Sequence, residues 1–171
     1  MTTGNTDKSK AKIAIITGGG RGLGRNTAIH LARRGGDIIL TYNANKAEAD
    51  SAVAEIEALG QKAVALKLDA GNVASFDAFV AEVGRALQQV WGRDRFDFLV
   101  NNAGTSYHAS IAETTEAEFD KLYNVHLKGV FFLTQKLLPH IVDGGRIVNI
   151  SSGLARFSNP GSSAYAAMKG A

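Results

Sequence analysis

Two side chains near the end of the sequence have the types and the spacing needed to transfer a proton. Tyr165 and Lys169 are four residues apart, so on a helix they would share one face. A nearby ammonium group favours the phenolate form of a tyrosine, which suits a general acid working near neutral pH. Ser151 and Ser152 end a predicted strand upstream of this pair. Each element also has a simpler interpretation: a turn serine, an amphipathic surface tyrosine or a solvated lysine.

A glycine-rich turn near the N-terminus has the composition of a phosphate-binding loop. The apolar run Ile13–Ile16 predicts a short buried strand, and Gly18, Gly22 and Gly24 follow it in the pattern G-x-x-x-G-x-G. Glycine allows positive φ and a close approach of the backbone to a phosphate. A helix predicted over residues 25–34 would add free N–H groups. A mobile turn is the alternative, and a P-loop is disfavoured because no Lys-Ser or Lys-Thr pair follows the glycines.

Polar residues also follow two later predicted strands. Asn101-Asn102-Ala103-Gly104 comes after the fourth strand, where amide side chains can hydrogen-bond a turn and Ala-Gly leaves room for a flat ligand. An ordinary polar turn is the alternative. Asp69 comes after the third strand. Its carboxylate would either accept a hydrogen bond from an adenine amino group or cap the following loop, and both interpretations stay open.

The elements that would position these residues alternate between strands and helices. Strands are predicted over residues 13–16, 37–42, 62–68, 96–100 and 146–150. Helices are predicted over 25–34, 46–59, 76–87 and 115–141, with Gly144-Gly145 ending the last of these, and again from about residue 162. This alternation predicts an α/β fold, a Rossmann-like doubly wound parallel sheet with strand order 3-2-1-4-5. The motifs would then meet at the carboxyl ends of the strands.

Length and composition predict one domain and exclude several classes of protein. Residues 1–10 are polar and predict a flexible tail, which leaves residues 11–171 for a dinucleotide-binding and catalytic domain. The formal net charge of +3 comes from scattered lysines and arginines, so no nucleic-acid surface is expected. No apolar run is long enough to span a membrane. The chain has no cysteine, which excludes disulfides and fits a cytoplasmic location. Its histidines lack metal-ligand spacing, so no metal site is expected.

Together these motifs resemble the short-chain dehydrogenase/reductase family. The resemblance extends from about Lys12 to the end of the chain, in the order Thr17-Gly18-x-x-x-Gly22-x-Gly24, Asn101-Asn102-Ala103-Gly104, Asn124, Ser152 and Tyr165-x-x-x-Lys169. It implies hydride transfer between a nicotinamide cofactor and a carbonyl or alcohol substrate.

The resemblance also implies roles for particular residues. Tyr165 would be the general acid/base, Lys169 would support it and hold the nicotinamide ribose, and Ser152 would hydrogen-bond the substrate oxygen. Asn124 would lie at a kink in the long helix and join a proton relay through Lys169. The cofactor would be held by Thr17, Gly18, Arg21, Gly22, Leu23, Gly24, Asp69, Asn101, Ala103, Gly104, Tyr165 and Lys169.

The residues after the second strand predict which cofactor is used. Enzymes that use NAD place a carboxylate there to bond the ribose 2′-hydroxyl, but residues 41–46 contain none. Arg21, in the glycine turn, would reach a 2′-phosphate instead, although a solvated arginine is the alternative. NADP(H) is therefore the preferred cofactor, with NAD(H) possible.

The end of the chain leads to two further expectations. The sequence stops two residues after Lys169, whereas members of the family continue. We therefore expect a C-terminally truncated fold with strand 146–150 as an open edge. The helix at 115–141 carries more apolar residues than one buried stripe needs, and the resemblance implies a homodimer or homotetramer for the complete chain.

Two other functions stay open. The first is a non-catalytic nucleotide-binding protein, which the early end of the chain favours. The second is a sugar-nucleotide epimerase or dehydratase, since related enzymes share Tyr-x-x-x-Lys. Their glycine turn usually follows G-x-x-G-x-x-G, which differs from the pattern here.

Overall fold

A five-stranded parallel sheet forms the centre of the computed structural model, which describes residues 11–171. The predicted tail at residues 1–10 lies outside the described residues. The strands are β1 (Ile13–Ile16), β2 (Asp37–Tyr42), β3 (Ala63–Lys67), β4 (Phe96–Asn101) and β5 (Ile141–Asn149). Their order is β3-β2-β1-β4-β5, and every neighbouring pair is parallel. The predicted Rossmann-like sheet and its strand order are confirmed.

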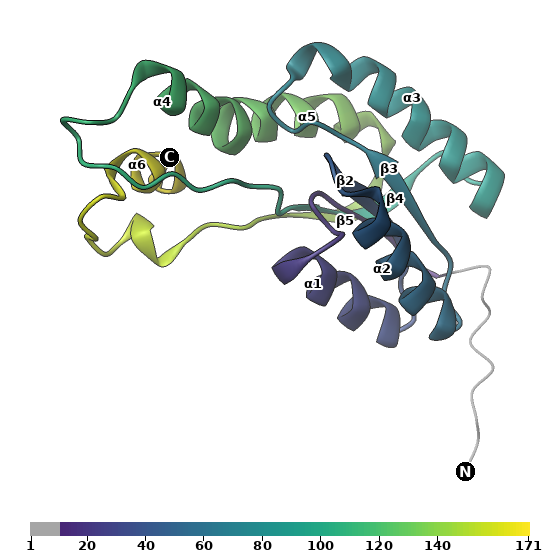
Figure 1. The fold of residues 1–171 in the computed structure, drawn as a ribbon. Helices are drawn as coiled ribbons and strands as arrows, with labels where there is room; N and C mark the ends of the chain where they lie inside the picture. Colours follow the sequence, from purple (N-terminus) through teal and green to yellow (C-terminus); the bar gives the residue numbers. More distant parts are fainter. Residues whose placement is uncertain (1–10) are drawn as a thin grey trace.

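Helices cover both faces of the sheet (Figure 1). One face packs against α1 (Gly22–Arg33) and α2 (Lys46–Ala58), and the other against α3 (Phe76–Ala86) and α5 (Gly129–Leu137). Along β1, Ile15 packs toward α3 and α5, whereas Ile16 packs toward α1 and α2. Both side chains are fully buried, as the unbroken apolar run of β1 predicts. Among residues 11–171, no helix has both the length and the apolar character to cross a membrane.

The long helical region predicted over residues 115–141 is helical from Glu116 to His140, but it is not one regular α-helix. The chain forms α4 (Glu116–Tyr123), a π-helical turn over Asn124–Lys128, and then α5. A short 3₁₀ turn over Leu138–His140 contains Pro139, which lacks the N–H needed to continue an α-helix. Such π-helical turns are frequent at functional sites.

The fifth strand begins earlier than predicted, because Gly144-Gly145 lies within β5 and does not separate a helix from a strand. The pairing of β5 with β4 is irregular between Phe96 and Phe98. Gly144 has φ +78°, and a Cβ on Gly145 would lie 2.7 Å from the carbonyl oxygen of Asp97. The glycines therefore accommodate a bulge. After β5, a loop leads to α6 (Ser163–Gly170).

Candidate functional site

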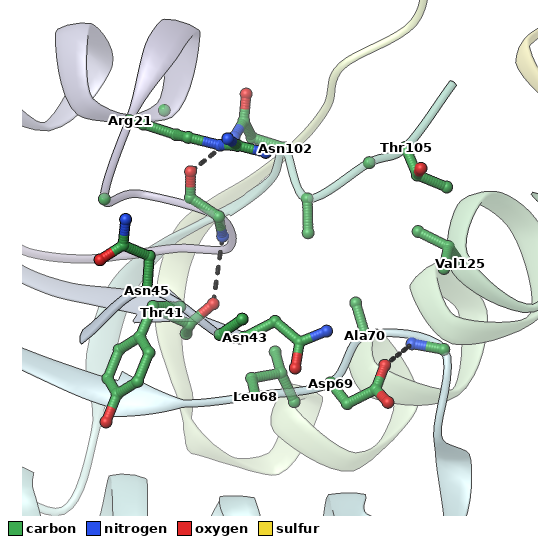
Figure 2. Close-up of a pocket in the computed structure, with 18 of the residues that line it drawn as sticks. Arg21, Thr41, Asn43, Asn45, Leu68, Asp69, Ala70, Asn102, Thr105 and Val125 are labelled. Atoms are coloured by element: carbon green, nitrogen blue, oxygen red, sulfur yellow. Dashed lines mark hydrogen bonds between the residues drawn. The ribbon is translucent and has the colours of Figure 1, made fainter. Parts of the chain in front are cut away.

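A cavity of about 1040 Å³ lies at the carboxyl ends of the strands. Its walls come from the glycine turn (residues 17–24), the loops after β2 and β3, the turn at Asn102–Thr105 and one side of α4 and the π-helical turn. Figure 2 shows Arg21, Asn43, Asp69, Thr105 and Val125 around this space. The predicted site residues that line it are Gly18, Arg21, Gly22, Leu23, Gly24, Asp69, Ala103, Gly104 and Asn124. The size and position suit a dinucleotide bound at the strand ends.

Two positions of the glycine turn require glycine, one because of its backbone angle and the other because of the close contacts around it. Gly18 has φ +65°, and a Cβ there would lie 3.1 Å from the Cα of Ala103. A Cβ on Gly24 would overlap the carbonyl oxygen of Gly18 and lie 2.5 Å from Nδ2 of Asn102. Side chains at these positions would fill the space against the loop after β4.

The first turn of α1 is open toward the cavity. The helix begins at Gly22, three residues earlier than predicted, so Gly22 and Gly24 belong to its first turn. The residue before it, Arg21, makes no side-chain cap. The backbone N–H groups of this turn are therefore available to an anion, and the helix dipole favours negative charge there. This geometry fits the pyrophosphate of a dinucleotide.

Hydrogen bonds from two neighbouring strands hold the glycine turn. Thr17 is buried, and its Oγ1 accepts from the backbone N–H groups of Asn102 and Ala103, both at 2.9 Å. Nδ2 of Asn102 donates to the carbonyl of Thr17 at 2.9 Å and to that of Gly18 at 3.3 Å. Thr41 Oγ1, on β2, accepts from the N–H of Gly18 at 3.1 Å (Figure 2). The turn is thus attached to both strands that flank β1.

The adjacent asparagines differ in role. Asn101 was predicted to contact the cofactor, but it is buried and does not line the cavity. Its Nδ2 donates to Asn149 Oδ1 at 2.8 Å and to Thr134 Oγ1 at 3.1 Å, so it joins β4 to β5 and α5. Asn102 lines the cavity instead. Successive strand residues point to opposite sides, and this separates the two side chains.

Both interpretations of Asp69 remain compatible with its position. Its Oδ1 accepts from the N–H of Gly71 at 3.0 Å, so the carboxylate caps the loop after β3. The side chain is exposed and lines the cavity, which leaves the other carboxylate oxygen available to a ligand.

The charges near the end of β2 are mixed. Arg21 is exposed and lines the cavity together with Asn43 and Asn45. Glu48, in the first turn of α2, also lines it, and its backbone N–H is capped by Oδ1 of Asn45 at 3.2 Å. Residues 41–46 contain no carboxylate, but the carboxylate of Glu48 lies near the same part of the cavity, at the start of α2.

The predicted proton-transfer residues lie outside the residues that line the cavity. Tyr165 and Lys169 are on α6, and Lys169 Nζ lies 5.8 Å from the centre of the Tyr165 ring. Lys169 Nζ also donates to the carbonyl of Ile150 at 2.8 Å, which ties α6 to the end of β5. Burial lowers the pKa of the Lys169 ammonium from its ordinary value. The Ser152 hydroxyl accepts from the N–H of Leu154 at 3.2 Å.

A histidine that the sequence analysis set aside contacts Tyr165. The rings of His126 and Tyr165 meet edge to face, with 5.3 Å between their centres. Asn124, predicted to join a relay through Lys169, lies two residues earlier, at the start of the π-helical turn. It lines the cavity, and its side chain makes no hydrogen bond within residues 11–171. No spacing in the sequence pointed to His126, because its partner is on a distant helix.

Residues 12–171 match the family model described as short chain dehydrogenase. The chain belongs to this family, as the sequence motifs predicted. Among curated proteins, it is 36% identical over 162 residues to the hydroxynaphthalene reductase-like protein Arp2 of Metarhizium brunneum. The aligned region is 94% of this chain but 58% of that protein. A short-chain dehydrogenase/reductase of Pestalotiopsis microspora is 37% identical with the same coverage.

Solved structures show the same relationship. The angucycline C-6 ketoreductase LanV with bound NADP superposes with a TM-score of 0.90 at 34% identity, over 93% of this chain and 62% of LanV. A short chain dehydrogenase from Burkholderia cenocepacia J2315 in complex with NADP gives a TM-score of 0.84 at 38% identity, over 93% of this chain and 63% of that one. The chain thus spans about three fifths of the length of the relatives it matches.

Proposed function

We propose that the protein is an oxidoreductase that transfers a hydride between NADP(H) and a carbonyl or alcohol substrate. The observation that carries the proposal is the pairing of Tyr165 with Lys169 on one face of α6, next to a cavity of dinucleotide size. Relatives named as reductases, and neighbours solved with NADP, support the same reaction. Because the chain spans only part of those relatives, the proposal concerns the whole protein.

The cofactor would fit the open first turn of α1, while Gly18 and Gly24 let the glycine turn pack closely against the loop after β4. When bound, NADPH supplies the hydride for the carbonyl carbon. Tyr165 donates its phenolic proton to the substrate oxygen, which becomes a hydroxyl. The cationic Lys169 stabilises the phenolate that remains, and the Ser152 hydroxyl orients the substrate oxygen. Oxidation of an alcohol reverses these steps.

Replacing Tyr165 by Phe tests this assignment, because it removes the hydroxyl and keeps the ring. Carbonyl reduction should fall by about a hundredfold or more, the scale of general acid catalysis, while NADPH affinity stays close to that of the parent. Turnover would be followed by loss of NADPH fluorescence with a panel of small ketones and hydroxynaphthalenes, the latter chosen from the names of the relatives. Near-normal turnover by the variant would disprove the assignment. NADPH binding without any turnover by the parent would favour a non-catalytic nucleotide-binding protein.

The preference for NADP(H) over NAD(H) rests on Arg21. Its guanidinium lines the cavity near the end of β2 and can bind a 2′-phosphate bidentately. Arg21→Ala should weaken NADPH binding about tenfold or more and change NADH binding little, since a charge-assisted pair contributes about 1.5–3 kcal/mol. Glu48→Gln is the matched control, because it removes an opposing charge and should strengthen NADPH. Equal losses for both cofactors in the Arg21 variant would contradict the preference.

We further propose that the complete protein is a cytoplasmic homodimer or homotetramer. Large apolar side chains are exposed along α4, α5 and the 3₁₀ turn after α5, namely Phe119, Tyr123, Phe131 and Leu138. Phe131 is 64% exposed. A second copy related by two-fold symmetry would cover such a surface with the same surface of its own.

A further inference from the structure

His126 is a buried histidine in the π-helical turn between α4 and α5. Its ring contacts Tyr165 on α6, and its Nε2 lies within hydrogen-bond distance of the Thr105 backbone. Thr105 in turn lines the cavity. His126 is thus the side chain that connects the wall of the cavity with the proposed proton donor.

The hydrogen bond defines the tautomer of the ring. Nε2 lies 2.6 Å from the carbonyl oxygen of Thr105 and 3.2 Å from its amide nitrogen. The contact at 2.6 Å requires a hydrogen on Nε2, whereas the Thr105 N–H, which points at the same nitrogen from 3.2 Å, requires a lone pair there. The shorter contact favours the form in which Nε2 donates to the carbonyl. Nδ1 is then an acceptor, and it is buried without a partner within residues 11–171.

The surroundings also keep the ring neutral. Burial is the main cause that lowers the pKa of His126; the hydrogen bond with Thr105 acts in the opposite direction, and the positive charge of Lys169 adds a smaller lowering effect. A proton on Nδ1 would be buried without an acceptor. The neutral ring donates one hydrogen bond and presents an edge contact to Tyr165.

Glycine at position 104 makes room for this arrangement. A Cβ there would lie 2.8 Å from Cε1 of His126, closer than real Cβ atoms come to a neighbour. The turn Asn101-Asn102-Ala103-Gly104 therefore leaves space for His126 behind the cavity wall as well as for a ligand in front of it.

We propose that His126 is a positioning residue, which fixes the Tyr165 ring relative to the turn at Ala103–Thr105. The inference rests on the proposed role of Tyr165 as the proton donor. Hydride and proton must reach one carbonyl group together, so the distance between the cavity and the phenol controls turnover. A misplacement of about 1 Å can reduce a rate about a hundredfold. His126 acts through Tyr165 and has no contact of its own with the substrate.

Two variants separate the contributions of the ring and the hydrogen bond. His126→Phe keeps an aromatic edge against Tyr165 and loses the Nε2 donor, whereas His126→Gln keeps a side-chain N–H donor and loses the ring. Each should lower kcat about tenfold or more, with the Kd for NADPH within about threefold and only a modest fall in the urea midpoint, which the loss of a buried hydrogen bond or ring explains. His30→Gln, an exposed change on α1, is the matched control and should alter none of these. A loss of stability and NADPH affinity equal to the loss of kcat would indicate a merely structural histidine and overturn the inference.

A second measurement needs no activity and separates failure of the inference from failure of the proposed function. In protein with isotope-labelled histidine and tyrosine, NMR should show His126 as the Nε2–H tautomer. A cross-relaxation peak should connect the His126 ring with the Tyr165 ring. The Tyr165 signals would be identified by their disappearance in Tyr165→Phe. His126→Gln should shift the Tyr165 ring signals, and His126→Phe should shift them less. Unchanged Tyr165 signals in the Gln variant would overturn the inference, whether or not the protein reduces carbonyls. A parent that shows the peak but no turnover would leave the contact in place and overturn the positioning role along with the proposed function.

Discussion

Replacing Thr17 by Val would remove one oxygen from the point where β1 meets the loop after β4. Thr17 is 2% exposed, and its Oγ1 accepts from the N–H groups of both Asn102 and Ala103. Valine has nearly the same shape but no acceptor. The two N–H groups would lose their partner beside the glycine turn, while the packing of the methyl groups is kept.

The magnitude follows from these two contacts. An unsatisfied buried N–H costs about 1–3 kcal/mol. Both donors are only partly buried and lie beside the cavity, where water can reach them, so each should cost about 1–1.5 kcal/mol, near the low end of that range. Thr17→Val should therefore destabilise the chain by about 2–3 kcal/mol. Thr17→Ser keeps the oxygen and loses one buried methyl group, which costs about 1 kcal/mol.

Urea unfolding followed by the fluorescence of Trp91 would measure both variants against the parent. The Val variant should be less stable than the Ser variant by about 1–2 kcal/mol, and it should also bind NADPH more weakly because the turn at Ala103 loses its support. Two equal losses of stability would refute the reasoning, since they would assign the effect to packing alone. A Val variant more stable than the Ser variant would refute it more strongly.

Two other predictions follow from charges and exposed surface. Burial alone would raise the pKa of Asp97, but hydrogen bonds from Lys12 and the Ile13 N–H, with the charge of Arg93, outweigh it and lower the pKa. The unfolded state then binds more protons, so this stability is present above about pH 4 and is lost as the pH falls through the lower folded pKa. Asp97→Asn should reduce stability at neutral pH, and the urea midpoint of the variant should fall less steeply than that of the parent below about pH 4. Equal slopes of urea midpoint against pH in the two proteins would contradict this. Light scattering should find that the complete protein is an oligomer. Phe131→Ser should shift it toward the monomer without changing its stability. A parent protein that is monomeric at micromolar concentration would contradict the proposed assembly.

The fold was predictable because its signals are local and repeated. Unbroken apolar runs such as Ile13–Ile16 indicated strands buried on both faces, and glycines ended the intervening helices near the predicted positions. Parallel topology then brings the carboxyl ends together, so the motifs at Gly18, Asp69 and Asn102 meet at one cavity. The interruption of the long helix was not predictable from periodicity, since its α-helical and π-helical turns carry similar apolar residues.

The feature of the candidate site that the sequence could not predict is the direction of single side chains. Asn101 and Asn102 are neighbours of the same type, and only the register of β4 decides that Asn102 faces the glycine turn. His126 was set aside for want of metal-ligand spacing. Its relevance depends on the packing of the π-helical turn against α6, which no spacing within either segment encodes.

The fold places the proposed cofactor site and the proposed proton-transfer residues in two separate parts. The glycine turn and Asn102 belong to the strand ends, whereas Tyr165 and Lys169 belong to α6, which Lys169 ties to the carbonyl of Ile150. A reaction that needs both parts depends on the side chains between them. His126 touches both parts, whereas Asn124 lines only the cavity. Replacement of His126 should therefore lower kcat and leave the Kd for NADPH nearly unchanged, as expected for a residue that acts through Tyr165.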